Sequence, residues 1–234
     1  MPAEELMSTA VVFIGGHPPH PGVLAHLPQD RWVVAADSGY DHATALGVEV
    51  DLLVGDMDSV SLDGLLDAAG HGVTIERFPT DKDFTDTELA LRAALRHGPS
   101  AMVVVSCVGD RLDHSISALM ALADPSLAAI PVEAWWGEAH VTVLRGPAAR
   151  VIGGSVGETV SLLPVDGPAE GVTTTGLLYA LHNEVLHATA SRGVSNVFTE
   201  PSLTIEVRHG ALLVIRPHAL RSATAAATPE EPRT

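Results

Sequence analysis

The first half of the chain alternates short apolar runs with segments of helical period, and this alternation limits the possible folds. Strands are predicted by β-branched, apolar runs at residues 10–14, 31–36, 52–54, 73–78 and 102–108. Helices are predicted by apolar spacing at residues 40–46, 62–69 (ending at Gly70), 86–97 and 112–123. Strands that alternate with helices favour a parallel sheet covered by helices.

The second half has a different pattern. From residue 132 to residue 216 short β-rich runs, among them 159–164 and 171–175, are separated by turn residues, without a long helical segment. This pattern is typical of an antiparallel sandwich or barrel. We therefore predict an α/β N-terminal domain with a mostly parallel sheet (1–130) and an all-β domain (131–220). Residues 221–234 are Ala, Thr, Pro and Glu without periodicity, which predicts a disordered tail.

Composition and charge exclude several classes of protein. The chain has 46% apolar residues and a formal net charge of −16, which argues against binding to nucleic acid or to anionic membranes. No apolar run approaches the roughly 20 residues of a membrane span. The first residues include Glu4 and Glu5 and lack the basic flank of a signal peptide. The single cysteine, Cys107, suits a reducing compartment, so we expect a cytoplasmic protein.

Acidic residues follow the predicted strands of the first half. Asp37 follows the second strand, Asp56 and Asp58 follow the third, Asp110 follows the fifth, and residues 81–86 (DKDFTD) open a helix after the fourth. In an open parallel sheet, ligands bind beyond the carboxyl ends of the strands. We therefore expect these acidic side chains to meet at one edge of the sheet.

A cluster of carboxylates is costly without a cation, because like charges a few ångströms apart repel. Hard oxygen ligands select Mg²⁺ or Ca²⁺, and Mg²⁺ combines one or two carboxylates with substrate phosphates. Lys82 and Arg111 add positive charge that suits those phosphates. The pattern predicts a site for phosphoryl-type transfer from a nucleotide bound with Mg²⁺.

Each acidic segment also has a structural interpretation. Asp81 and Thr85 are suitable N-caps for the following helix. Asp86 would lie in its first turn, where the partial positive charge of the helix N-terminus stabilises a carboxylate. Asp56 and Asp58 lie beside Gly55 and are suitable turn formers. No single segment decides between these structural roles and a role in binding a metal ion.

Five elements together resemble the thiamine pyrophosphokinase family. Residues 55–59 (GDMDS) resemble its GDxDS element, residues 81–91 (DKDFTDTELAL) its DKDxTDxExAL stretch, and residues 109–114 (GDRLDH) its GGRxDH element. Residues 172–179 (VTTTGLLY) and 191–196 (SRGVSN) resemble its two substrate-side motifs. The order and spacing match from about residue 11 to residue 216, and five elements in order are far more specific than any one of them.

The resemblance implies direct transfer of pyrophosphate from ATP to thiamine, which gives AMP and thiamine diphosphate. It implies an ATP-binding α/β catalytic domain, a thiamine-binding β-sandwich, and an active site completed in a homodimer. The Mg²⁺-facing carboxylates would be Asp37, Asp56, Asp58 and Asp86. The residues that contact the nucleotide would be Lys82, Thr85, Arg111 and Asp113, and catalysis would rest on Asp56, Asp58, Asp86 and Arg111. Thiamine would be bound by Thr175, Tyr179, Ser195 and Asn196.

The chain departs from the family pattern at several positions. Asp110 stands where the family usually has a second glycine, Ala118 where it often has Asn, Leu178 where Lys is common, and Val197 where Glu is common. Two alternatives follow from these departures. One is a pyrophosphokinase-like enzyme that acts on a different alcohol such as a pterin, and the other is a non-catalytic protein that binds a nucleotide or thiamine.

Overall fold

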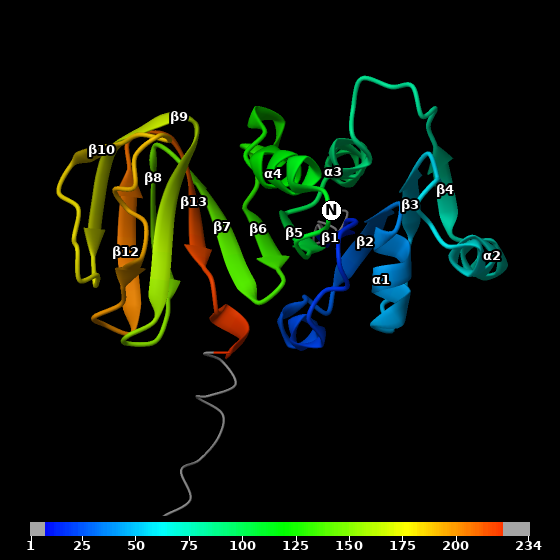
Figure 1. Cartoon of the computed structure of the whole chain (residues 1–234), viewed down its shortest axis with the longest axis horizontal. Coiled ribbons are helices and arrows are strands. Elements are labelled where there is room, and N and C mark those ends of the chain that lie inside the picture. The colour runs from blue at the N-terminus through cyan, green and yellow to red at the C-terminus, as the bar shows by residue number, and fades with distance from the viewer. Residues whose placement is uncertain (1–7, 222–234) are drawn as a thin grey trace, which may run out of the picture. The chain divides into compact units, whose positions relative to one another are not determined.

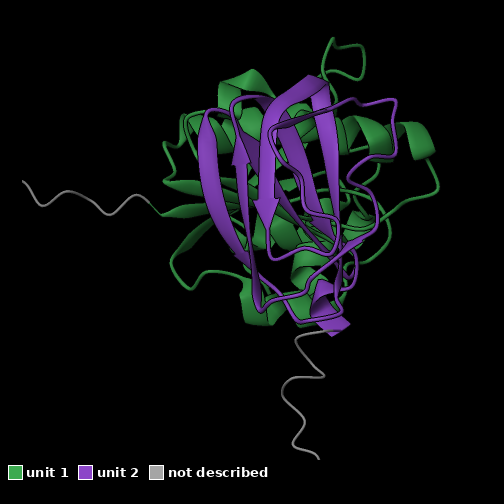
Figure 2. Ribbon diagram, turned by 90° about the vertical axis from the view of Figure 1, so that its left-hand side faces the viewer, with its two compact units in different colours: residues 1–137 green, residues 138–234 purple. Residues whose placement is uncertain are grey.

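The structure is a computed structural model that describes residues 8–221, and it divides into two compact units, residues 1–137 and residues 138–234 (Figure 2). The predicted disordered tail, 221–234, lies outside the described residues except for Arg221. The Nε atom of Arg221 lies 2.6 Å from Oε2 of Glu138 within the second unit.

The first unit is a parallel sheet with helices in the connections (Figure 1). Its strands are β1 (Thr9–Phe13), β2 (Arg31–Ala36), β3 (Leu52–Gly55), β4 (Thr74–Arg77), β5 (Ala101–Ser106) and β6 (Val132–Trp136). Its helices are η1 (Pro21–His26), α1 (Gly39–Ala45), α2 (Leu62–His71), α3 (Asp86–Arg96), α4 (Leu112–Ala121) and η2 (Pro125–Leu127). Every strand pair given for this sheet is parallel, which confirms the α/β prediction.

The strand order of this sheet, β4-β3-β2-β1-β5-β6, reverses direction between β1 and β5. Connections from β1 to β4 run toward one edge, whereas β5 and β6 continue toward the other. With right-handed crossovers, α1 and α2 cover one face and α3 and α4 the opposite face. In agreement with this, α3 and α4 contact each other. The connections after β1 and β5 therefore turn to opposite faces of the sheet, and such a switch point is the usual ligand position in these folds.

The centre of the first unit is apolar on both faces of the sheet. Residues 10–13 of β1 are completely buried, and β4 at the edge is short and largely exposed. A central parallel strand has helices on both faces, so it carries a continuous apolar run rather than an alternating one. This explains why the sequence pattern was strongest for the central strands.

The end of α2 differs from the prediction. The sequence placed a helix end at Gly70, but α2 continues to His71, and Gly72 ends it in the left-handed conformation with φ of 73°. Glycine adopts this conformation without the steric cost that a Cβ atom imposes. Gly70 and Gly72 both indicate a helix end in the sequence, but only Gly72 adopts the capping geometry.

The second unit is antiparallel. Its strands are β7 (Ala139–Arg145), β8 (Ala148–Gly153), β9 (Thr159–Thr175), β10 (Glu184–Leu186), β11 (Asn196–Val197), β12 (Ser202–Val207) and β13 (His209–Arg216). The order is β7-β13-β9-β12-β8, and β10 and β11 also pair with β9. Between these strands lies a core of buried aliphatic residues and Phe198. The all-β sandwich predicted for this half is confirmed.

Strand β9 links the two layers of the second unit. Its first part pairs with β13 and its last part with β12, so the strand passes from one layer to the other. Asp166 and Gly167 adopt φ of 61° and 106°, and Gly171 adopts φ of 68°. The prediction of two separate strands, 159–164 and 171–175, was therefore wrong, because these turn residues bend a continuous strand instead of ending it.

Strands β6 and β8 were not assigned individually from the sequence. The change of pattern placed residues from 132 onward in the all-β half, but β6 pairs in parallel with β5 and belongs to the first unit. A short apolar run contains no information about the direction of its partner strand. Its place in the parallel sheet follows only from the long-range pairing.

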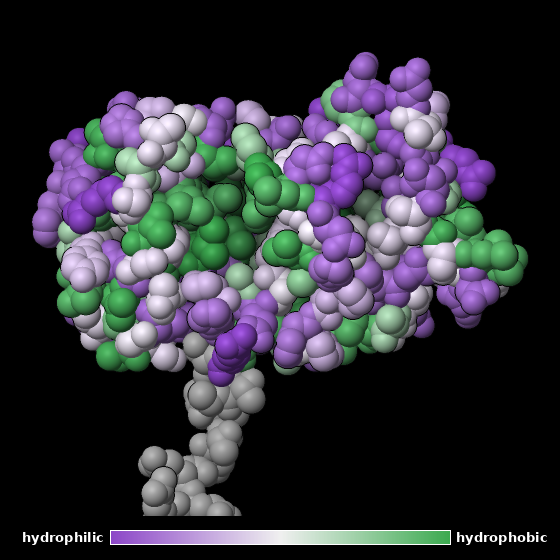
Figure 3. Space-filling model, viewed as in Figure 1, coloured by the Kyte–Doolittle hydropathy of each residue, from purple (hydrophilic) through white to green (hydrophobic). Residues whose placement is uncertain are grey.

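Some apolar side chains are exposed on the first unit. Leu62 and Leu66 of α2 are 73% and 65% exposed, and Figure 3 shows a hydrophobic area over α2 in the view of Figure 1.

Among residues 8–221, no helix has the length and apolarity that crossing a bilayer requires.

The core of the second unit provides a stability test. Ile205 of β12 is completely buried, so Ile205→Ala leaves a cavity and should lower the free energy of unfolding by about 2–5 kcal/mol. Val151 of the neighbouring β8 is 66% exposed, and Val151→Ala should change it by less than about 0.5 kcal/mol. Urea unfolding followed by circular dichroism measures both, and equal losses for the two variants would contradict the assignment of the core.

Candidate active site

A cavity of about 650 Å³ lies at the carboxyl ends of the strands of the first unit. Its lining comes from the segments after β1, β2, β3 and β5 and from the beginnings of α3 and α4. The reversal of strand order between β1 and β5 explains its position. Its volume is in the range of about 300–1,000 Å³ typical of sites for small ligands.

Asp37 is the most buried carboxylate of the cavity. It follows β2 directly, is 8% exposed, and adopts φ of 44°. Its Oδ1 atom accepts a hydrogen bond of 3.2 Å from the backbone N–H of Met57. A Cβ atom on Gly55 would overlap Oδ1 of Asp37, so only glycine permits this packing. The glycine of the GDMDS segment is therefore needed for the position of a carboxylate on the neighbouring strand.

Asp56 and Asp58 form a turn after β3. The backbone N–H of Asp58 donates a 3.1 Å hydrogen bond to Oδ1 of Asp56, so the role in turn formation expected as an alternative is real. The same turn brings both side chains to Asp37. One oxygen from each of the three carboxylates lies within 4.8 Å of the others. Oxygen ligands grouped in this way can hold a hard divalent cation.

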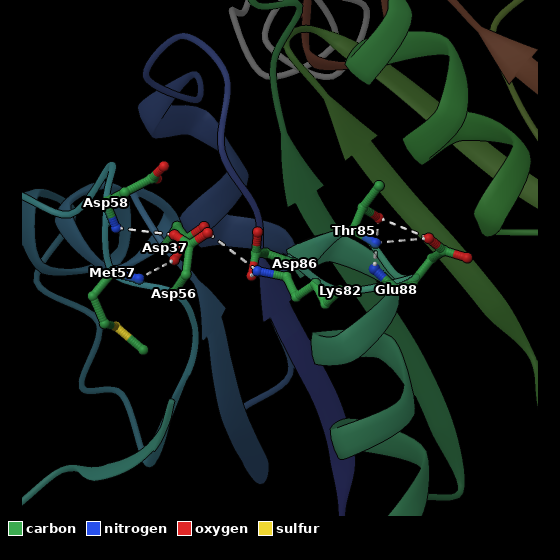
Figure 4. A network of polar contacts seen from close by, with 8 residues as sticks. All are labelled: Asp37, Asp56, Met57, Asp58, Lys82, Thr85, Asp86 and Glu88. Atoms are coloured by element: carbon green, nitrogen blue, oxygen red, sulfur yellow. Dashed lines mark hydrogen bonds and ion pairs between the residues drawn. The ribbon is translucent and has the colours of Figure 1, made fainter. Parts of the chain in front are cut away.

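Lys82 neutralises part of this cluster (Figure 4). Its Nζ atom lies 3.2 Å from Oδ2 of Asp56 and 2.8 Å from Oδ1 of Asp86, and the lysine side chain is only 12% exposed. Asp86 begins α3, so this ion pair connects the segment before α3 to the turn after β3. The structure thus brings Asp37, Asp56, Asp58, Lys82 and Asp86 together in one network.

Burial and the nearby charges shift the pKa values of three carboxylates in the cluster. Burial, together with the charges of Asp86 and Asp56, raises the pKa of Asp37 from 3.8 to about 7. Burial and the charge of Asp56 also raise the pKa of Asp58. Burial acts in the same direction on Asp56, but hydrogen bonds from Asp58 and Lys82 outweigh it and lower the pKa of Asp56.

Thr85 has a clear structural role. It is the N-cap of α3, where its Oγ1 atom accepts a 3.2 Å hydrogen bond from the N–H of Glu88. The carboxylate of Glu88 in turn accepts from the N–H of Thr85 at 3.0 Å, which completes a capping box. The cap is thus Thr85, whereas Asp81 is exposed. Thr85 also lines the cavity, so capping does not remove it from the site.

Arg111 and Asp113 form an exposed pair at the start of α4. Arg111 lines the cavity, and its Nη2 and Nε atoms lie 2.6 Å and 3.2 Å from the carboxylate oxygens of Asp113. These hydrogen bonds lower the pKa of Asp113 to about 2. Both side chains are about two-thirds exposed, so water screens the pair.

The predicted substrate residues of the second half all belong to the second unit. Asn196 is 2% exposed, accepts a 3.0 Å hydrogen bond from the N–H of Tyr179, and donates a 2.8 Å bond to its carbonyl. Asn196 therefore holds the Tyr179 backbone, and the Tyr179 ring is exposed. Ser195 and Thr175 are also exposed, and the N–H of Ser195 bonds to Oγ of Ser161 at 3.0 Å.

The sequence did not identify several residues that line the cavity. These are His17, Ser106, Cys107, His114 and Trp136. Ser106 donates a 2.9 Å hydrogen bond to the carbonyl of Gly15 and so fixes the loop after β1. Trp136 is 8% exposed, and its Nε1 atom is buried without a hydrogen-bond partner among the described residues. Two signals were available: His17 comes immediately after Gly15 and Gly16, and His114 ends the GDRLDH element, although neither was given a role.

The raised pKa of Asp37 predicts a pH dependence of stability without divalent cations. Between about pH 4 and pH 7 the folded protein keeps a proton that the unfolded chain loses, so stability falls as pH rises and is level above about pH 7. Asp37→Asn cannot ionise and should be more stable than the parent protein by roughly 1–3 kcal/mol at pH 8. The difference should shrink toward pH 4.

Urea unfolding in EDTA at several pH values tests this prediction. The exposed Asp83 provides a matched control, because Asp83→Asn should leave the pH profile unchanged. An Asp37→Asn protein that is less stable than the parent at pH 8 would contradict the raised pKa.

Comparisons with known proteins agree with this geometry. A family model described as "Thiamin pyrophosphokinase, catalytic domain" matches residues 25–133, and one described as "Thiamin pyrophosphokinase, vitamin B1 binding domain" matches residues 150–212. No curated protein matches the chain significantly.

Solved structures share the fold over nearly the whole described chain. Thiamine pyrophosphokinase from Bacillus subtilis is 22% identical with a TM-score of 0.78, and the alignment covers 89% of this chain and 98% of that one. A thiamin pyrophosphokinase family protein from Enterococcus faecalis is 25% identical with a TM-score of 0.73 and the same coverage. Yeast thiamin pyrophosphokinase is 15% identical with a TM-score of 0.70, covering 92% of this chain and 87% of that one. Because both domain models match and together span most of the chain, the protein belongs to the thiamin pyrophosphokinase family of enzymes.

Proposed function

We propose that this enzyme transfers the pyrophosphoryl group of ATP to the hydroxyl of thiamine, which gives AMP and thiamine diphosphate. The observation that carries the proposal is the group formed by Asp37, Asp56 and Asp58, with Lys82 against it, inside the cavity at the point where the strand order reverses. In this proposal the first unit, residues 1–137, binds ATP and the second unit, residues 138–234, binds thiamine.

The donor set of the cluster fits Mg²⁺. The grouped ligand atoms are all carboxylate oxygens, which suit Mg²⁺ better than zinc or copper. The raised pKa of Asp37 is consistent with this assignment: burial raises it first and the charges of Asp86 and Asp56 add to it, and a bound cation would offset both effects. Asp37, Asp56 and Asp58 would hold the ion, with Asp86 beside them. When bound, Mg²⁺ supplies neutralisation and alignment of the ATP phosphates.

Other residues of the cavity suit the phosphates themselves. A Cβ atom on Gly16 would overlap the carbonyl of Cys107, and one on Gly109 would lie 3.1 Å from Cα of Gly16. The two loops therefore lie close together, and Gly16 is an exposed residue of the cavity lining. Arg111 provides positive charge in the lining, and Thr85 lies there at the start of α3. Lys82 adds positive charge next to Asp56 and Asp86 of the lining.

The reaction needs positioning and charge stabilisation more than covalent catalysis. The thiamine oxygen forms a bond to the β-phosphorus of ATP, the bond from that phosphorus to the oxygen of AMP breaks, and the hydroxyl proton is released. In the proposal Lys82 and Arg111 stabilise the charge on the phosphates. No covalent enzyme intermediate is part of the proposal.

The second unit supplies the features expected of an acceptor site. The thiazolium ring of thiamine is cationic and favours the face of an aromatic ring. Tyr179 presents an exposed ring whose backbone is fixed by Asn196, and Thr175 and Ser195 offer exposed hydroxyl groups. The proposal includes a homodimer, which the family resemblance implies, and a cytoplasmic location, where ATP is available.

The test of the function is AMP release by the purified protein with ATP, Mg²⁺ and thiamine, beside a control without thiamine. We expect AMP formation that depends on thiamine, recovery of thiamine diphosphate, and loss of activity in EDTA. Asp56→Asn should lower the rate by at least about 100-fold, because it removes a metal-facing charge. The exposed Asp83→Asn protein serves as the matched control and should retain activity.

Three results would change the proposal. AMP release with a pterin but not with thiamine would assign a different acceptor. Binding of ATP without AMP release from any acceptor would indicate a non-catalytic protein. Full activity in Asp56→Asn would overturn the metal assignment while leaving the reaction in place.

Tyr179 allows the acceptor site to be tested separately. Tyr179→Ala should raise the KM for thiamine about tenfold or more and leave the KM for ATP nearly unchanged, because the ring belongs to the second unit. Tyr179→Phe keeps the aromatic face and should remain close to the parent protein. An equal rise in both KM values for Tyr179→Ala would show that the residue supports the fold rather than thiamine.

A further inference from the structure

An ion pair crosses the rim of the cavity between two loops. Nε2 of His17, in the loop after β1, lies 3.3 Å from Oδ1 of Asp110, in the loop after β5. Both residues line the cavity, and their side chains are 58% and 93% exposed. The pair lies outside the carboxylate network around Lys82.

The backbone fixes the position of His17. The carbonyl of Gly15 accepts a 2.9 Å hydrogen bond from Oγ of Ser106, and the carbonyl of Gly16 lies 2.9 Å from Nε2 of His42, which donates to it. Two successive peptide groups are thus anchored immediately before His17. The loop after β1 therefore presents the imidazole at a defined place on the rim.

Asp110 is fixed from the other side. The N–H of Gly109 bonds to Oγ of Ser115 at 3.4 Å, and the missing Cβ of Gly109 lets this loop approach Gly16. The adjacent cation, Arg111, is already paired with Asp113 through two hydrogen bonds. Within residues 8–221, His17 is therefore the ion-pair partner that the structure gives to Asp110.

A carboxylate at this place is a problem for the function proposed above. The cavity has to admit the phosphates of a nucleotide, and it already contains Asp37, Asp56, Asp58 and Asp86. A free Asp110 carboxylate at the entrance would repel the phosphates, because it has no metal ion to bridge the charges. A carboxylate that accepts a hydrogen bond from imidazole is held in place, and protonated imidazole also neutralises it.

We propose that His17 is a positioning residue that compensates Asp110: it holds this carboxylate at the rim and so keeps the entrance open to the phosphates of ATP. The inference rests on the proposed function, because it assumes a nucleotide in the cavity. It assigns to the pair a role in nucleotide affinity and none in the transfer step. His17 should therefore affect ATP binding only through Asp110.

A double-mutant cycle tests this coupling, with ATP binding in Mg²⁺ measured by calorimetry without thiamine and the KM for ATP measured in the transfer assay. His17→Ala should weaken ATP binding about threefold to fivefold, in keeping with an exposed ion pair, and leave kcat unchanged. Asp110→Asn should bind ATP as tightly as the parent protein or more tightly. In the Asp110→Asn background, His17→Ala should have no effect.

His17→Gln provides the conservative variant, since its amide N–H can still donate to Asp110, and it should recover most of the affinity. Equal weakening by His17→Ala in both backgrounds would overturn the proposal, because His17 would then contact the nucleotide directly. Unchanged affinity in His17→Ala would overturn it as well. The melting temperature of each variant shows that the fold is retained.

The experiments distinguish a failure of the proposed function from a failure of the compensating pair. If the parent protein binds ATP and the cycle shows coupling, but no acceptor yields AMP, the compensating pair stands and the transfer reaction does not. If the parent protein transfers pyrophosphate and the cycle shows no coupling, the reaction stands and the pair does not. A parent protein that binds no ATP would contradict both.

Discussion

The packing of the Asp37 carboxylate against Gly55 is the constraint on which the rest of the site depends. A side chain at position 55 would displace Asp37, and the N–H of Met57 would lose its acceptor. The turn that carries Asp56 and Asp58 would then separate from the end of β2. This arrangement has a cost, because burial and then the charges of Asp86 and Asp56 raise the pKa of Asp37, while Lys82 pairs with Asp56 and Asp86. The site is therefore arranged for a charge that a divalent cation can supply.

The parallel sheet determines where this constraint acts. Its strand order reverses between β1 and β5, and the segments after these strands line the cavity. Glycines at positions 16 and 109 let the two loops approach each other. Ser106, the last residue of β5, donates a hydrogen bond to the carbonyl of Gly15 in the loop after β1. Apolar burial stabilises the central strands, whereas the functional groups occupy the strand ends, where a side chain contributes little to the core. Within each strand, the residues that stabilise the fold are thus different from the residues that form the site.

The sequence predicted the features that depend on local pattern. The central strands and the helices of the first unit follow from periodicity, and Asp37, Asp56 and Asp58 meet because the carboxyl ends of parallel strands share one edge. Features that depend on long-range pairing were not predicted: β6 lies in the parallel sheet, and β9 is one strand through Asp166 and Gly167. Trp136 was missed for the same reason. The roles of the individual site residues remain predictions, and the burial of Asn196 favours an indirect role, through the backbone of Tyr179.

Arg111 lines the cavity, Lys82 lies against two of its acidic lining residues, and both cations already have acidic partners. Arg111 is paired with Asp113 at the surface, where water screens the interaction, so exchange of Asp113 for a phosphate costs little. Lys82 is nearly buried between Asp56 and Asp86, and its departure would leave two carboxylates without a counter-ion. In the proposed reaction Asp37, Asp56 and Asp58 would hold Mg²⁺, which would supply a second positive charge beside Lys82. That charge would lower the cost of placing a phosphate next to the carboxylates, while Lys82 keeps its contacts with Asp56 and Asp86.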